Sequence, residues 1–238
     1  METVVALAIA AVALSFFVGA FAPATIGIKR ASSVEDAKLL ADALEAELNI
    51  LRPSLDTGYT TSFEKAFDLV ANSGVDGNEV PNLAGALVAF KYRADVSAAA
   101  VDGVYNAYTG IDFNDAGSVN APSMRVQNRV TTLASVVGAA AGNPVNSVEG
   151  NIFLVALRQI VRDPASGTLT VSNPGGNLTD SSGGTAGTAA AYLDPVILVQ
   201  ADFFVLESNS PGYLRAIQAG SIDLPSRPIY STKFGITR

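Results

Sequence analysis

The sequence predicts an α+β protein, in which a long N-terminal helix is followed by a mixed head with an antiparallel sheet. Helical spacing of apolar residues dominates the first half of the chain, whereas runs rich in branched residues and bounded by turn signals come later. The 238 residues are enough for one substantial domain besides that helix. We therefore divide the chain into an N-terminal helix, residues 1–53, and a globular head, residues 54–238.

The composition argues against several classes of function. The chain has no Cys and no His, which removes thiol nucleophiles, imidazole acid–base chemistry and thiolate zinc sites. Its formal net charge is -7, the opposite of what a phosphate-binding surface needs, so we expect no nucleic-acid partner. The sequence contains no Gly-rich phosphate loop, nucleophile elbow or dinucleotide fingerprint. We therefore predict that the chain is not an enzyme and has no cofactor.

The N-terminal helix is expected to begin with an apolar stretch. Residues 3–28 include no charged residue, and as a helix they would span roughly 39 Å, enough to cross the ~30 Å hydrocarbon core of a bilayer. Three interpretations follow: a cleaved signal peptide, a permanent membrane anchor, or an apolar helix packed against copies of itself. Ala20-Phe21-Ala22 supplies a cleavage pattern. A signal peptide requires basic residues before its apolar stretch, and here no Lys or Arg precedes it. The other two interpretations are therefore favoured.

Pro23 lies inside this apolar stretch. Proline removes one backbone hydrogen bond from a helix and clashes with the preceding turn, so we expect the helix to kink or open there. Gly19 and Gly27 lie four residues on either side. Either these residues are simply tolerated, as Pro and Gly are in membrane helices, or they form an extensible segment.

An amphipathic helix, residues 33–51, is expected after Lys29 and Arg30 close the apolar stretch. Ser32 and Glu35 have capping-box spacing, so a new helical register is predicted to begin with Ser32 as its N-cap. Apolar residues at three- and four-residue spacing predict one buried face, formed by Ala37, Leu40, Ala41, Leu44, Leu48 and Leu51. Arg52-Pro53 predicts the end of the helix. The first 52 residues are thus expected to form one nearly continuous helical rod.

This layout resembles the N-terminal helix of type IV pilins. In that family an apolar helix starts the mature chain, a proline near its middle lets the helix melt locally, and the amphipathic half is covered by a globular head. Pro23 and Pro53 fall close to that pattern. At the fifth position, where the family has an acidic residue that neutralises a neighbour's terminal amine, this chain has Val5. The resemblance implies a homopolymer assembled through the N-terminal helices, with the assembly residues Glu2, Gly19, Pro23 and Gly27.

We therefore expect a structural subunit of an extracellular pilus-like helical filament, inserted in a membrane before or during assembly. The alternative is a single-pass integral membrane structural protein, such as a capsid-associated protein rooted in a virion membrane. Lys29 and Arg30 follow the apolar stretch, and basic residues tend to stay on the cytoplasmic side, which favours an inward-facing head. A membrane-tethered enzyme or binding protein is a third possibility without residue-level support.

In the head, helices are expected first and strands later. Patterns and caps predict helices at 61–70, 95–108, 123–141 and 211–219, whereas 83–93 fits a strand or a helix. Strands are predicted at 152–161, 168–171, 196–206 and, at a sheet edge, 229–236. The first two should form a hairpin around the turn at 163–167. The Gly-rich stretch 173–190 is expected to be a flexible exposed loop.

Two turns in the head offer oxygen ligands suited to a hard cation such as calcium. Their residues are Asp112, Asn114 and Asp115 in one turn, and Asp76, Asn78 and Glu79 in the other. The twelve-residue calcium loop fails at the first turn, because Ala116 replaces a ligand and Ser123 stands where a bidentate Glu belongs. A solvated turn is therefore the preferred interpretation of both.

Two further patterns have chemical alternatives. Ser62 and Lys65 have the spacing of a serine–lysine nucleophile pair, but the partner motifs of such enzymes are missing and a helix start explains both residues. Asn177 begins an N-glycosylation sequon, Asn177-Leu178-Thr179, on the loop that we expect to be exposed.

Overall fold

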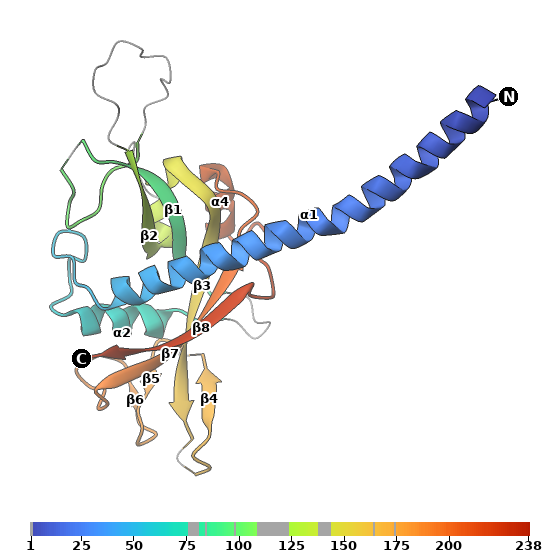
Figure 1. Cartoon of the computed structure of the whole chain (residues 1–238). Coiled ribbons are helices and arrows are strands. Elements are labelled where there is room, and N and C mark those ends of the chain that lie inside the picture. The colour runs from blue at the N-terminus through green and yellow to red at the C-terminus, as the bar shows by residue number, and fades with distance from the viewer. Residues whose placement is uncertain are drawn as a thin grey trace.

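The computed structural model describes residues 2–75, 81–83, 85–97, 99–108, 124–137, 144–163, 165–173 and 175–238. The helices are α1 (Glu2–Leu48), α2 (Ser62–Asn72), α3 (Leu133–Val137) and α4 (Pro211–Gln218), with a 3-10 turn at Pro144–Ser147. The strands are β1 (Leu87–Asp95), β2 (Met124–Thr132), β3 (Val148–Arg162), β4 (Leu169–Ser172), β5 (Leu178–Thr179), β6 (Thr185–Ala186), β7 (Val196–Val205) and β8 (Tyr230–Thr237). The protein is α+β, as predicted (Figure 1).

An antiparallel sheet forms the centre of the head. Its strand order is β2-β1-β3-β7-β8, and β4 pairs with the outer part of β3. Leu87 of β1 lies opposite Val155 of β3, and Phe153 of β3 lies opposite Val205 of β7. Among the described strands β8 pairs only with β7, so the prediction of a terminal edge strand is confirmed.

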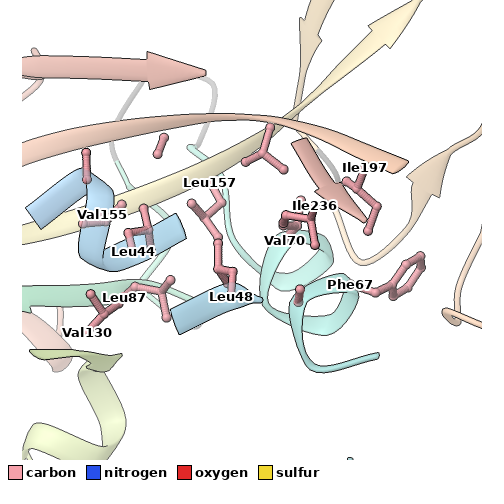
Figure 2. Close-up of a cluster of buried hydrophobic side chains, with 14 of the residues drawn as sticks. Leu44, Leu48, Phe67, Val70, Leu87, Val130, Val155, Leu157, Ile197 and Ile236 are labelled. Atoms are coloured by element: carbon pink, nitrogen blue, oxygen red, sulfur yellow. The ribbon is translucent and has the colours of Figure 1, made fainter. Parts of the chain in front are cut away.

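Both faces of the sheet are buried. Leu154 and Val155 are neighbours on β3, point to opposite faces, and are both fully buried. One face packs against α2 and the second half of α1, and Figure 2 shows Leu44 and Leu48 of α1 within that cluster. The other face packs against α3, α4 and the 3-10 turn. Coverage on both sides explains why the central strands are apolar nearly throughout, rather than alternating.

The long N-terminal helix is a single element of 47 residues. It continues through Pro23, and Figure 1 shows it curving smoothly, so the expected opening at this proline is not found. A new register at Ser32 is also wrong. The next residue, Ser33, donates its hydroxyl to the Lys29 carbonyl at 2.9 Å, a bond that a serine makes inside a continuous helix. The helix ends at Leu48, a few residues before the predicted stop at Pro53.

Two predicted helices of the head are wrong. In the segment 95–108, Asp102 and Gly103 have φ angles of 49° and 82°, which a right-handed helix does not accept, and Val101 and Val104 form a tight turn. Most of the described part of 123–141 is strand β2, which pairs along its whole length with β1; only α3 is helical. The ambiguous segment 83–93 contains the start of β1, a strand.

The remaining predictions for the head are largely confirmed. α2 begins after Thr61, whose side chain accepts the Glu64 amide at 3.1 Å, and β3 and β4 form the expected hairpin. β7 and α4 also lie where the sequence placed them. The stretch 173–190 differs, because it contains the short pair β5 and β6 and buries Leu178 completely. Leu178 joins the core beside α2, which ties this stretch to the head.

Candidate functional site

The first half of α1 extends away from the head (Figure 1). From Ser33 to the end of the helix one face is buried, through Ser33, Ala37, Leu40, Ala41, Leu44 and Leu48. Before Ser33, each side chain that the structure describes is exposed, including all of 23–32. We call residues 2–32 the projecting segment. The predicted buried face of the amphipathic half is therefore confirmed, with the exception of Leu51, which follows the helix and is half-buried.

A group of polar residues holds α1 where it leaves the head. Asp36 forms an ion pair with Lys91 of β1. Asn151 of β3 donates to the Ser33 hydroxyl at 3.1 Å and to the second carboxylate oxygen of Asp36 at 3.4 Å. We call these four residues the helix clasp. They fix α1 to two central strands of the sheet at the base of the projecting segment.

The projecting segment exposes large apolar side chains. The six described ones are 54–77% exposed: Val12, Leu14, Phe16, Phe21, Ile26 and Ile28. Successive helical residues turn by about 100°, so Val12, Phe16 and Ile26 lie along one side and the other three along the opposite side. An apolar helix face on one side suits a single partner surface. Apolar side chains on two opposite sides suit surroundings that are apolar all round.

The predicted assembly residues all belong to this segment. Gly19 and Gly27 lie within α1, and no described atom lies within 4 Å of the place that a Cβ would take at either position. Pro23 is exposed. Glu2 is the first residue of α1, and its side chain is outside the described residues. The structure thus places the four residues on one helix, without close contacts of the two glycines to the described head.

The inner end of α1 joins a network of charged residues. The Arg52 guanidinium donates to both carboxylate oxygens of Glu47, at 2.8 to 3.1 Å. Lys65, which is 3% exposed, donates to Glu47 at 3.1 Å, to Asp56 at 2.8 Å and to the Ile50 carbonyl at 2.9 Å. An ammonium group has three protons, and these three acceptors take all of them. The pKa of Arg52 is raised by its hydrogen bonds to Glu47.

The serine–lysine pattern is accounted for by this network. Lys65 donates its three hydrogen bonds to the end of α1 and the loop after it. Ser62 is the first residue of α2, next to the N-cap Thr61. Glu64 strengthens this start, because it accepts the Thr60 amide at 2.9 Å. That hydrogen bond lowers the pKa of the Glu64 carboxyl. The structure therefore places Lys65 in a structural ion network rather than beside the Ser62 hydroxyl.

The candidate calcium ligands lie outside the described residues, both at Asp112, Asn114 and Asp115 and at Asp76, Asn78 and Glu79. Within the described ranges, no group of three or more acidic side chains is placed to hold a metal ion. Asn177 is described and exposed, so the sequon asparagine lies at the surface. The helix clasp carried no sequence signal, because it joins Asp36 to residues 55 and 115 positions further along the chain.

Comparison with known proteins found no matching family model, no matching curated protein and no matching solved structure. A search of the described residues found no helix that is both long and apolar enough to cross a membrane. The projecting segment and the helix clasp that holds it are therefore the features of the molecule that bear on function.

Proposed function

We propose that the chain is a structural subunit of a pilus-like helical filament, with the N-terminal helices of many copies bundled in the core and the heads outside. The observation that carries this proposal is the two-sided exposure of apolar side chains on the projecting segment. A helix in a bundle core meets neighbours on more than one side. Contacts between unlike faces of identical subunits form a ring where the rotation between subunits closes and a helical filament where it does not, and the filament is the form proposed here.

The head supports the same proposal. Among the described side chains of α1, the head covers those of the amphipathic half and leaves those of the projecting segment exposed. The resemblance to type IV pilins implies the same arrangement. The helix clasp fixes the base of the segment, so a neighbouring subunit would meet a helix with a defined direction. Under this proposal the monomer is inserted in a membrane before assembly, and the finished filament is extracellular.

One observation favours a second candidate function. Lys29 and Arg30 are both exposed and lie between the apolar stretch and the helix clasp. In a membrane protein, basic residues at this boundary would lie among lipid headgroups and favour a cytoplasmic head. The chain would then be a single-pass structural protein, for example one that links a virion membrane to a coat.

Electron microscopy of the purified full-length chain separates the two candidates. We expect thin filaments that contain no lipid, with a helical repeat that places the heads at the surface. Lipid-containing particles, or a chain that stays dispersed under every condition that removes detergent, would overturn the filament proposal. Particles with bound lipid would support the membrane structural protein instead.

A substitution on the projecting segment tests the surface itself. Ile26 is 68% exposed, and Ile26→Asp places a charge where a neighbouring helix would pack. We expect I26D to abolish filament formation, because burying an unpaired carboxylate is strongly unfavourable, while the melting temperature of the head stays the same. The matched control is Ser32→Asp, which adds the same charge at an exposed polar position of the same helix. Filaments of normal length from I26D would contradict the proposed surface.

A further inference from the structure

A pocket of about 500 Å³ lies in the head, at the end of α1 remote from the projecting segment. We propose that this pocket binds a small organic carboxylate with an apolar body, whose charged end pairs with Arg129. Nothing in this proposal depends on filament assembly, because the pocket is formed by residues of the head and the inner end of α1. We call it the Arg129 pocket.

The walls of the Arg129 pocket are largely apolar. The described walls come from the end of α1, the loop after it, helices α2 and α3, strands β1 and β2, and the turn at 99–108. Their apolar members include Leu48, Leu55, Leu87, Phe90, Val101 and Val104. The volume falls in the range of roughly 300–1,000 Å³ that small-molecule sites have in proteins. Such a site takes an apolar ligand and orients it with a few polar groups.

The charged residues of the pocket do not balance. Among the described residues its lining has three cations, Arg52, Lys65 and Arg129, and two carboxylates, Glu47 and Asp56. The two carboxylates are already engaged, Glu47 by Arg52 and Lys65, and Asp56 by Lys65 and the Arg52 backbone amide. The chain as a whole is acidic, with a net charge of -7, whereas the described lining of this pocket has more cations than carboxylates.

Arg129 is the cation of this lining that has no ion-paired carboxylate among the described residues, although Glu47 and Asp56 lie near enough to act on its charge. Its guanidinium forms no hydrogen bond or ion pair with any residue that the structure describes, whereas Arg52 and Lys65 each have acidic partners. It lies on β2 opposite Phe90, and its side chain is half-buried. Burial lowers the pKa of the guanidinium, with the nearby Glu47 acting in the opposite direction. A partly desolvated guanidinium beside an apolar pocket favours a carboxylate, which it can bind through two parallel hydrogen bonds.

Isothermal titration calorimetry tests the proposal with 4-tert-butylbenzoate and, as an uncharged analogue of the same shape, 4-tert-butylbenzamide. The full-length chain is kept in a neutral maltoside detergent, and titration into empty micelles supplies the blank. We expect saturable binding of the carboxylate with at least tenfold higher affinity than the amide. Equal affinities, or no saturable binding beyond the blank, would overturn the proposal.

Variants assign the charged contact. Arg129→Gln should lower the affinity for the carboxylate at least tenfold, to that of the amide, and Arg129→Lys should restore part of it. Arg162→Gln is the matched control, because Arg162 is exposed on β3 and does not line the pocket. The R162Q variant should bind the carboxylate with the same affinity as the unmodified chain. Unchanged binding by a folded R129Q would contradict the assignment. If R129Q fails to fold, the carboxylate should still raise the melting temperature of the unmodified chain more than the amide does, and equal shifts would contradict it.

Discussion

Lys65 is a buried cation that connects three segments of the chain. Lys65 belongs to α2. Its ammonium group binds Glu47 at the end of α1, and Asp56 and the Ile50 carbonyl in the loop that follows. Both carboxylates are mostly buried, with side chains 16–17% exposed. Removal of the cation would therefore leave two carboxylates short of a partner in surroundings that solvate them poorly.

We predict that Lys65→Met lowers the free energy of unfolding by about 3 kcal/mol, measured by urea denaturation, since breaking a buried ion pair from one side leaves an uncompensated charge. The control is Ser62→Ala in the same helix, at a position whose hydroxyl is not the cap. We expect that change to stay within about 0.5 kcal/mol. A K65M variant as stable as the unmodified chain would show that the network has no stabilising role.

Tyr192 is a titratable group in the core. It is 2% exposed, and its ring lies 5.8 Å from that of Phe67, measured between centroids. Burial, with the nearby Asp194 as a smaller cause, raises the pKa of its phenol to about 12. The phenol is thus kept protonated in the folded chain at a pH where it would ionise in the unfolded chain.

We predict an alkaline loss of stability that depends on Tyr192. Because the folded-state pKa is the higher one, the stabilisation is complete below the ordinary pKa of about 10 and is lost as the pH rises towards 12. The loss should amount to roughly 2 kcal/mol for this residue. Urea denaturation at pH 9 and above, compared with Tyr192→Phe, measures it. A pH dependence identical in Y192F would contradict the prediction.

At the scale of elements, the second half of α1 belongs to the core of the head. Leu44 is fully buried between the sheet and α2, whereas Leu39 on the same helix is 50% exposed. We predict that Leu44→Ala lowers the free energy of unfolding by about 2–5 kcal/mol, because it leaves a cavity in the core. Leu39→Ala, which removes the same atoms from an exposed position, should change it by about 0.5 kcal/mol or less. Similar losses in both variants would contradict this packing.

The elements also show where sequence patterns stop being informative. The buried face of α1 follows from local spacing, and the sequence alone predicted it correctly. β2 was predicted as a helix, because its strand state depends on pairing with β1, whose paired residues lie 29 (Asp95 to Met124) to 45 (Leu87 to Thr132) positions earlier in the chain. The turn at Asp102 and Gly103 was missed because the Ala-rich composition around it favours a helix. Local composition cannot encode the pairing of β2 with β1, which is a long-range constraint, whereas the turn at Asp102 and Gly103 is a local feature.

The candidate sites also differ in how far the sequence alone predicts them. The apolar part of the projecting segment could be located from sequence, since the lack of charged residues over 3–28 is a local property. The helix clasp and the Arg129 pocket could not, because each joins residues from separate parts of the chain. Arg129 in particular has no neighbour in sequence that distinguishes it from the other arginines of the chain. Its candidate role depends on the apolar pocket walls around it and on the carboxylates of Glu47 and Asp56, which are already bound by other residues.

At the scale of the whole molecule, α1 has two parts, the projecting segment and the half that packs into the core of the head. The described side chains of the helix are exposed before Ser33, and its buried face begins there. We predict that deletion of residues 2–28 leaves the melting temperature of the head within a few degrees of the unmodified chain, whereas deletion of residues 2–48 abolishes the cooperative transition. Circular dichroism during heating measures both. A large loss of stability from the shorter deletion would show that the apolar segment supports the head.

The helix clasp has a mechanical consequence. A force that pulls on the first half of α1 reaches the head through Ser33 and Asp36, whose partners lie on β1 and β3. These two strands are paired with each other inside the sheet, so the load is shared by several backbone hydrogen bonds acting in parallel. Tension on the N-terminus would therefore be passed to paired strands in the middle of the sheet.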